Sequence, residues 1–257
     1  MQKDCSTLEN NQSQFGRTID LLGDDGFKAL QDAFVVIVGL GGVGCHASVS
    51  LVRSGLGKIR LVDFDLLTES SLNRHVFATR ADVGRPKAEI MRDHILAVNP
   101  DCEVEIVKEF FHNDTAEEIL KDNPDYIIDA IDSFTPKVAL LRYAAENKLK
   151  IVSSMGASGH MDPTKILSAD ISETHTCPLA RVVRRKLRQQ GVSRGITTIF
   201  STESPAPTLP PDTSDNTEWR GRQRNQLASL GVIPGIFGYA LSGIVITEIS
   251  GYNHTGN

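Results

Sequence analysis

A glycine-rich loop and five charged side chains after it have the types and the order that chemistry on a nucleoside triphosphate requires. The loop runs from Gly39 to Gly44, and the charged residues are, in chain order, Asp63, Asp65, Arg74, Lys87 and Asp132. A carboxylate that attacks a triphosphate brings like charges together, so Arg, Lys and usually Mg²⁺ are needed to neutralise them. A dinucleotide pyrophosphate can be held by a glycine loop alone. The set therefore indicates adenylation more than hydride transfer.

The glycine loop lies between an expected strand and an expected helix. It follows the apolar run 34–38 and opens a helical pattern that continues to Ser54. Glycines at this point allow a tight turn and the close approach of a nucleotide, and the helix N-terminus adds a partial positive charge. We therefore expect four residues to hold phosphate groups: Gly39, Gly41, Gly42 and Gly44. Alone, the loop indicates a nucleotide but no particular one.

The charged residues follow expected strand ends and helix starts. Asp63 comes at the end of the expected strand 58–62, where a carboxylate usually binds ribose hydroxyls. Lys87 follows Pro86 at an expected helix start, and Asp132 follows the apolar run 126–131, at the carboxyl end of a parallel strand. Asp132 could thus hold Mg²⁺. Asp65 is either a further ligand of the metal or of a water, or a turn residue.

Taken one at a time, these residues have plainer interpretations. Arg74 and Lys87 can be solvated surface charges, and Asp132 can cap a helix ahead of Pro136. Their joint order favours a site. An NAD-dependent oxidoreductase would use the loop and Asp63 but would leave the two cations and Asp132 without a role.

Four strings carry a resemblance to a known superfamily. They are Val62-Asp63-Phe64-Asp65, Asn73-Arg74, Val83-Gly84-Arg85-Pro86-Lys87 and Asp129-Ala130-Ile131-Asp132. In this order they resemble the nucleotide motifs of the ubiquitin-activating-enzyme-like adenylyltransferases, over roughly residues 15–250. Within that superfamily the chain is most similar to the tRNA threonylcarbamoyladenosine dehydratases. The strings that carry this closer similarity are Asp129–Ser133, Pro136-Lys137, Gly156–Gly159, Asp162–Ile166, Pro178–Ala180 and Phe200–Glu203.

The resemblance implies a fold and a reaction. The fold is α/β, a Rossmann-like, mostly parallel sheet with helices on both faces, and the active unit is a homodimer. The reaction uses ATP and Mg²⁺ to adenylate the free carboxylate of threonylcarbamoyladenosine, beside the anticodon of a tRNA. An atom of the same modification then closes a ring and expels AMP, so the nucleoside loses one water. The partner is tRNA, and positioning with charge neutralisation supplies most of the catalysis.

The resemblance also implies a role for each site residue. Arg74 and Lys87 bind the β- and γ-phosphates and stabilise charge at the α-phosphate, while Asp132 holds Mg²⁺. Asp63 binds the ribose, and the nucleotide site includes Asp65 and Asn73. In related adenylyltransferases an arginine near the N-terminus reaches the nucleotide of the neighbouring subunit, and Arg17 stands at the matching place, with a surface arginine as the alternative.

Two departures from the superfamily pattern bear on function. Ser71 occupies a position where many members have asparagine. The serine would weaken or reshape contacts to the γ-phosphate or the metal. It also leaves open that the chain is a non-catalytic binding module. The chain has no CxxC pair, and its four cysteines, Cys5, Cys45, Cys102 and Cys177, are scattered. This argues against zinc and against a disulfide framework. It also disfavours the alternative function, activation of the C-terminus of a ubiquitin-like or sulfur-carrier protein. Cys177 is the one candidate for a thioester.

A segment near residue 185 is strongly basic, although the chain as a whole is acidic. Net charge is −5, yet no acidic residue interrupts the cations Arg181, Arg184, Arg185, Lys186, Arg188 and Arg194. Folded RNA is a polyanion that such a helix would bind. Three further arginines around Trp219, at positions 220, 222 and 224, could add phosphate contacts and stacking. A solvated helix face or an acidic protein partner is the alternative.

The organisation we expect is one adenylation domain over residues 15–250. The polar residues 1–14 are expected to form a flexible tail without an export signal, and the proline-rich residues 204–217 a mobile loop. Residues 227–249 carry one charge, Glu248, and several glycines. They are expected to form an apolar helix that packs on the sheet or at the dimer interface, in a cytoplasmic protein. The alternative is association with a mitochondrial membrane.

Overall fold

Seven strands form a single sheet in which the chain winds outward in both directions from β1. The computed structural model describes residues 5–210 and 227–253, with side chains from residue 14 onward. The strand order is β3-β2-β1-β4-β5-β7-β6, and every neighbouring pair is parallel except β6 and β7. The strands are β1 (Phe34–Val38), β2 (Lys58–Val62), β3 (Glu103–Val107), β4 (Tyr126–Asp129), β5 (Ile151–Ser154), β6 (Ile166–Asp170) and β7 (Thr197–Ser201). This is the fold class that the sequence predicts.

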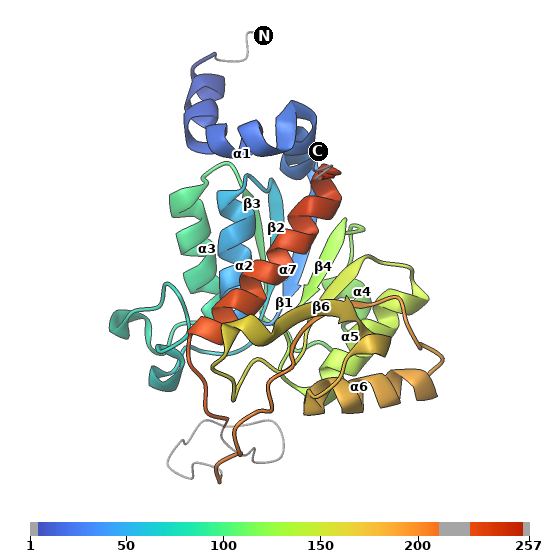
Figure 1. Ribbon diagram of the computed structural model, residues 1–257. Coiled ribbons are helices and arrows are strands. Elements are labelled where there is room, and N and C mark those ends of the chain that lie inside the picture. Colours follow the sequence, from blue (N-terminus) through green and yellow to red (C-terminus); the bar gives the residue numbers. More distant parts are fainter. Residues whose placement is uncertain (1–4, 211–226, 254–257) are drawn as a thin grey trace.

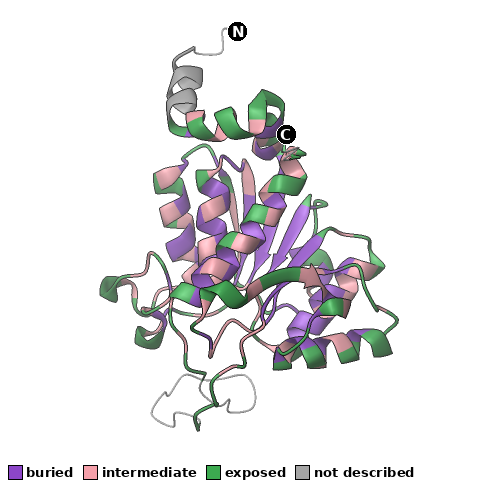
Figure 2. Cartoon of the chain, viewed as in Figure 1, coloured by how far each residue is buried: buried purple, intermediate pink, exposed green. Residues whose placement is uncertain are grey.

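Helices cover both faces of the sheet, which explains why β1 is apolar and buried at every position. Alternate residues of β1 belong to two cores: Val35 and Ile37 face one, and Val36 and Val38 face the other. The first core lies under α2 (Gly42–Arg53), α3 (Lys87–Val98) and α7 (Val232–Ser250). The second lies under α4 (Ala116–Ile119), α5 (Phe134–Glu146) and α6 (Pro178–Gln189). Figures 1 and 2 show the buried strands between these two layers.

Helix α1 (Cys5–Asp32) differs from the expected flexible tail. The chain is helical from Cys5, and the helix path bends at Gly23, where φ is 73°. Apolar contacts hold the later part of α1: the rings of Phe15 and Phe27 lie 5.4 Å apart and both are buried. The polar composition of residues 5–14 gives no apolar pattern that would predict this helix. Figure 1 places α1 at the amino-terminal end of the strands.

Helix α7 begins at Val232, five positions later than the expected apolar helix, with Gly231 as its N-cap. Among the described residues it alone has the length and hydropathy of a membrane span. Its inner face packs on α2: a Cβ added at Gly238 would lie 2.4 Å from the carbonyl oxygen of Val43. Phe237, Leu241 and Val245 are fully buried in the first core. This packing is that of a core helix in a globular domain.

The expected proline-rich loop is described only in part. Residues 204–208 form neither helix nor strand. Residues 211–217 lie outside the described residues, as do Trp219 and the three arginines near it.

Candidate nucleotide-binding site

The glycine loop turns from β1 into α2, and its glycines differ in the space around them. Gly39 has a φ of 95°, and a Cβ there would lie 2.8 Å from the carbonyl oxygen of Ala130. A Cβ on Gly44 would lie 1.8 Å from the carbonyl oxygen of Gly39. Because they lack a Cβ, these two glycines allow the close backbone contacts of the turn. A Cβ on Gly41 would meet nothing within 4 Å, and no side chain caps the first turn of α2. The open side of the loop is thus at Gly41, before a helix N-terminus suited to anions.

Asp63 fixes the glycine loop from the end of β2. Its Oδ2 accepts the N–H of Leu40 at 2.6 Å, and its Oδ1 accepts the N–H of Asp65 at 2.8 Å. Its side chain is buried, and this burial raises the pKa of the Asp63 carboxyl, against the opposing charge of Lys87. Each carboxylate oxygen can accept a second hydrogen bond, so a ribose contact is compatible with this geometry. The loop-fixing role was not expected from the sequence.

Lys87, the first residue of α3, lies among the carboxylates. Its Nζ is 2.7 Å from Oδ2 of Asp65, and its backbone N–H donates to the carbonyl of Asp65 at 3.1 Å. Burial lowers the pKa of Lys87, but the charges of Asp63, Asp65 and Asp132, with the hydrogen bond to Asp65, raise it above its usual value overall. The structure therefore brings four of the five expected charged residues into one electrostatic neighbourhood.

Arg74 lies on the other side of the glycine loop. Its Cγ would be 3.2 Å from a Cβ at Gly42, and its Nη1 donates to the carbonyl of Ser70 at 2.7 Å and to Oδ1 of Asn73 at 3.0 Å. The amide of Asn73 also donates to the carbonyl of Ser229 at 2.9 Å, so Asn73 ties this loop to the segment before α7. These contacts place the Arg74 stem against the loop that we expect to hold phosphates.

Asp132 is exposed beyond the end of β4. With Phe110, Phe134 and Pro136 it lines a pocket of about 380 Å³, and the hydroxyl of Ser133 lies 3.1 Å from its Oδ1. Within residues 14–210 and 227–253, no three His, Cys, Asp or Glu side chains gather so as to hold a metal. Mg²⁺ commonly takes one or two carboxylates together with substrate phosphates and waters. One carboxylate near Lys87 fits that mode of binding.

A buried ion pair supports the turn that carries Asp132. Lys137 Nζ lies 2.5 Å from Oδ2 of Asp129 and 2.8 Å from the carbonyl of Ser154, and both charged side chains are fully buried. The hydroxyl of Ser153 donates to the same Asp129 oxygen, while Asp129 Oδ1 accepts the N–H of Ile131. The pair joins β4, β5 and α5 directly beneath Asp132.

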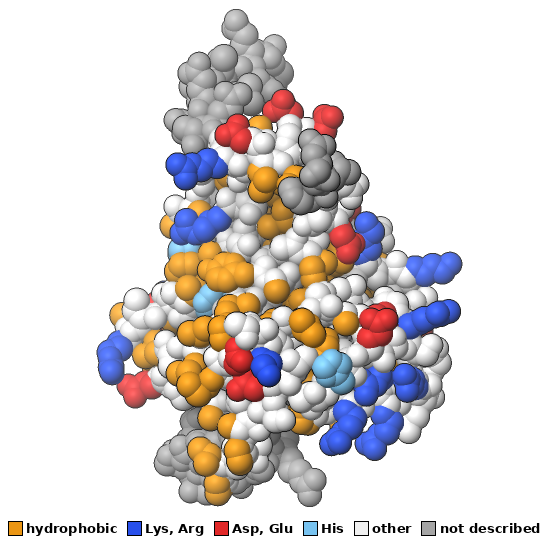
Figure 3. Space-filling model, in the orientation of Figure 1, with side chains coloured by type: hydrophobic (Ala, Val, Ile, Leu, Met, Phe, Trp, Pro, Cys, Tyr) orange, Lys and Arg blue, Asp and Glu red, His pale blue; other side chains and the backbone are white. Residues whose placement is uncertain are grey.

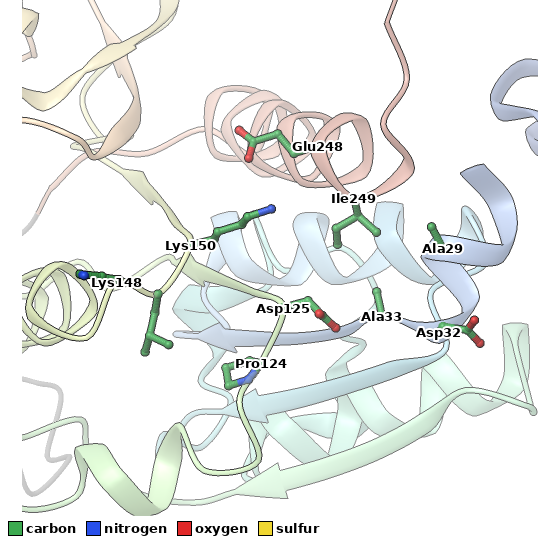
Figure 4. Close-up of a pocket in the computed structure, with 10 residues that line it drawn as sticks. Ala29, Asp32, Ala33, Pro124, Asp125, Lys148, Lys150, Glu248 and Ile249 are labelled. Carbon is green, nitrogen blue, oxygen red and sulfur yellow. The ribbon is translucent and has the colours of Figure 1, made fainter. Parts of the chain in front are cut away.

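A second pocket, of about 410 Å³, lies at the opposite end of the strands (Figure 4). Asp125 and Lys150, which line it, directly precede β4 and β5. The charged loop after β2 lies at the carboxyl ends, so this pocket is not part of the nucleotide site. Arg17 is exposed on α1, which is also at the amino-terminal end. Arg17 therefore does not join the site of its own chain.

Helix α6 presents most of its cations to solvent. Its buried face is Ala180, Val183 and Leu187, and the exposed cations are Arg181, Arg185, Lys186 and Arg188. Figure 3 shows Lys and Arg side chains gathered where Figure 1 draws α6. Arg184 differs from the expectation: it is half-buried, and its Nη1 donates to the carbonyl of Thr174 at 2.5 Å. Through this hydrogen bond, Arg184 holds the loop that precedes α6.

Cys177 is a buried helix cap. It is 2% exposed, and its Sγ accepts the N–H of Ala180 at 3.5 Å at the start of α6. Formation of a thioester would require a substrate to reach Sγ, which this burial prevents.

Ser71 is also buried, and its hydroxyl lies 3.0 Å from that of Thr68.

Comparison with known proteins decides the family. A model of the ThiF family matches residues 15–257. The chain belongs to the ThiF family. The tRNA threonylcarbamoyladenosine dehydratase of Bacillus subtilis is 42% identical over 75% of this chain and 76% of its own length. The Saccharomyces cerevisiae dehydratase 2 is 41% identical over 95% of this chain, which spans 56% of that longer relative. The resemblance to these dehydratases is thereby confirmed.

Solved structures of a relative agree with the fold. The Escherichia coli tRNA N6-threonylcarbamoyladenosine dehydratase in complex with ATP has a TM-score of 0.82 and 31% identity, over 93% of this chain and 95% of that one. Its complex with AMP has a TM-score of 0.83. ATP and AMP are the substrate and product nucleotides of an adenylation reaction.

Proposed function

We propose that this chain is an ATP-dependent tRNA threonylcarbamoyladenosine dehydratase. The observation that carries the proposal is the position of Lys87, held by carboxylates at the start of α3, beside a glycine loop that is open at Gly41. Its support is the family membership reported above, with relatives that bear this name. The absence of CxxC from the sequence disfavours the alternative, activation of a carrier protein's C-terminus.

The proposed chemistry begins with attack on ATP. Arg74 and Lys87 bind the β- and γ-phosphates and neutralise charge as a carboxylate oxygen of the modified nucleoside attacks the α-phosphorus. An oxygen–phosphorus bond forms, and the bond to the β-phosphate breaks and releases pyrophosphate. Asp63 binds the ribose, and Asp65 orients Lys87 from within the nucleotide site. Mg²⁺, held by Asp132 and phosphate oxygens, would supply further charge neutralisation.

Ring closure follows within the modified nucleoside. A nucleophilic atom of the threonylcarbamoyl group attacks the activated carbonyl carbon, and the acyl–oxygen bond breaks. The oxygen leaves on AMP, so the nucleoside loses one water overall. The protein positions the two reacting groups and needs no nucleophile of its own.

We further propose that the exposed cations of α6 bind tRNA phosphates and that the active unit is a homodimer. Support for the dimer is the exposure of large apolar side chains on or near β6 and α7, namely Met161, Leu167, Val232 and Tyr239. In such a dimer Arg17 would reach the nucleotide of the partner subunit. We assign the protein to the cytoplasm, with α7 in the domain core.

The proposal is tested by incubating the protein with ATP, Mg²⁺ and tRNA that carries threonylcarbamoyladenosine. AMP release coupled to loss of one water from the nucleoside, measured by mass spectrometry, is expected. AMP release with a small carrier protein, and none with any modified tRNA, would replace the proposal with the alternative.

A further inference from the structure

The side chain of Asn73 joins the guanidinium of Arg74 to the segment before α7. Its Oδ1 accepts from Nη1 of Arg74 at 3.0 Å, and its Nδ2 donates to the carbonyl of Ser229 at 2.9 Å. A guanidinium only donates and a backbone carbonyl only accepts, so this orientation of the amide satisfies both contacts. Both ends of one carboxamide are therefore engaged, one by a cation of the site and the other by a residue far along the chain.

The segment that Asn73 binds is itself fixed at two points. The carbonyl of Ala228 accepts the N–H of Gly159, in the loop after β5, at 2.7 Å. At Gly231 the chain passes so close to the other loop that an added Cβ would lie 2.7 Å from the backbone carbonyl oxygen of Asn73. Ser229 lies between these two points, so its carbonyl holds the Asn73 amide in one place.

The stem of Arg74 is held by packing, and its head by hydrogen bonds. A Cβ added at Gly42 would lie 3.2 Å from Cγ of Arg74 and 3.0 Å from Cβ of Pro234 in α7, so the glycine loop and α7 fix the course of the stem. The described contacts of the head are both on Nη1, with the carbonyl of Ser70 at 2.7 Å and with Asn73. A planar guanidinium oriented through one nitrogen can still donate from the other two to a phosphate.

We propose that Asn73 is a positioning residue of the nucleotide site, which acts on the phosphates through Arg74 and does not itself touch the nucleotide. Its carboxamide ties the Arg74 guanidinium to the fixed carbonyl of Ser229, so the cation is oriented before ATP arrives. An oriented side chain loses less conformational entropy on binding, and ATP therefore binds more tightly. The inference rests on the proposed binding of phosphate by Arg74.

A double-mutant cycle separates this role from direct contact with the nucleotide. The full chain is titrated by calorimetry with AMP and with an ATP analogue that has a methylene group between the α- and β-phosphorus. Asn73→Ala is expected to weaken binding of the analogue about fivefold, the size of one hydrogen bond, and to change AMP binding less than twofold. In an Arg74→Ala background, Asn73→Ala is expected to cause no further loss, because no cation remains for it to orient.

Asn147→Ala is the matched control. Asn147 is exposed like Asn73, and its side-chain amide also donates to a backbone carbonyl, that of Tyr143, at 2.9 Å. It follows α5 and precedes β5, at the opposite end of the strands, so this variant should bind both nucleotides as the wild type does. An analogue affinity that Asn73→Ala leaves unchanged, or an equal loss with and without Arg74, would overturn the proposal.

Gly231→Ala disturbs the same contact from the other side and covers the case in which Asn73→Ala does not fold. Its added Cβ must displace the segment from the carbonyl of Asn73, so it should weaken binding of the analogue when Arg74 is present and not in Arg74→Ala. Gly243→Ala, in α7, is the control, because a Cβ there meets nothing within 4 Å. Equal losses from Gly231→Ala in both backgrounds would contradict the proposal.

These titrations need no tRNA, which separates the two proposals. Failure of the dehydration assay would refute the proposed function and leave the assignment of Asn73 standing. A failed cycle in a protein that dehydrates the nucleoside would refute the assignment alone. No binding of the analogue by the wild type would refute both.

Discussion

Lys87 and Asp65 contact each other twice, through a 2.7 Å ion pair between Nζ and Oδ2 and through a 3.1 Å hydrogen bond from the Lys87 N–H to the Asp65 carbonyl. The backbone bond fixes the start of α3 against the loop after β2. The side-chain bond orients a cation that is only 12% exposed. The ammonium group is therefore positioned before any nucleotide arrives, which is how charge stabilisation becomes effective in catalysis.

Lys87→Ala should lower the rate of AMP release by about two to three orders of magnitude, because one preorganised charge is lost from the transition state. Binding of tRNA should persist, since α6 is unchanged. Both are measured on the same preparations, by nucleotide chromatography and filter binding. Lys121→Ala, which removes an exposed cation paired with Glu118, is the control and should keep wild-type rates. Wild-type activity of Lys87→Ala would refute the assigned role.

Arg185→Ala and Arg184→Ala should have different effects, although the two residues are adjacent. Arg185 is exposed, so its loss should weaken tRNA binding and reduce the slope of log affinity against log salt by about 0.7 to 0.9. Arg184 holds the carbonyl of Thr174, so its loss should chiefly lower thermal stability. Binding measured between low and moderate salt, with thermal melts, separates the two. An unchanged salt slope in Arg185→Ala would remove α6 from the RNA interface.

Stability should depend on pH through His75. Burial lowers its pKa to about 4 in the folded protein from 6.5, so the unfolded chain binds more protons between these values. The stability that the neutral ring provides is complete above pH 6.5 and is lost as the pH falls through 4, by about 2 kcal/mol between pH 7 and pH 5. Urea unfolding at both pH values checks this. His75→Leu should lack that part of the loss, and an identical loss in both proteins would contradict the burial of a neutral ring.

Lys137→Met should lower the free energy of unfolding by about 3–5 kcal/mol, because it leaves Asp129 buried without its partner. Combining it with Asp129→Asn, which removes the charge but keeps an acceptor for the N–H of Ile131, should recover much of this loss. Denaturant unfolding of the single and double variants gives the comparison. Additive losses in the double variant would show that the two side chains do not act as a pair.

The parts of the fold that the sequence predicts are those with strong local patterns. The apolar run 34–38 followed by a glycine loop, and the carboxylates at strand ends, are typical of a parallel sheet with a nucleotide crevice. The polar start of α1 has no apolar periodicity, so its helix was not expected. Hydropathy does not reveal that α7 begins only at Val232, with Gly231 as its N-cap.

The sequence brings forward candidate site residues, but it does not reveal their contacts. The Asp63 carboxylate accepts the backbone N–H of Leu40, and the Arg184 side chain donates to the backbone carbonyl of Thr174. Such contacts depend on how segments distant in the sequence meet in the fold. His75 carried no signal in the sequence beyond its place after Arg74. Its burial, on which the pH dependence rests, is seen only in the packed structure.

The most direct test follows oxygen from the nucleoside to the nucleotide. Threonylcarbamoyladenosine in tRNA is prepared with ¹⁸O in its carboxylate and incubated with the protein, ATP and Mg²⁺. If the carboxylate attacks the α-phosphorus and ring closure then breaks the acyl–oxygen bond, each AMP carries one ¹⁸O. Label found in inorganic phosphate with ADP as the nucleotide product, or unlabelled AMP beside a dehydrated nucleoside, would contradict adenylation by this site.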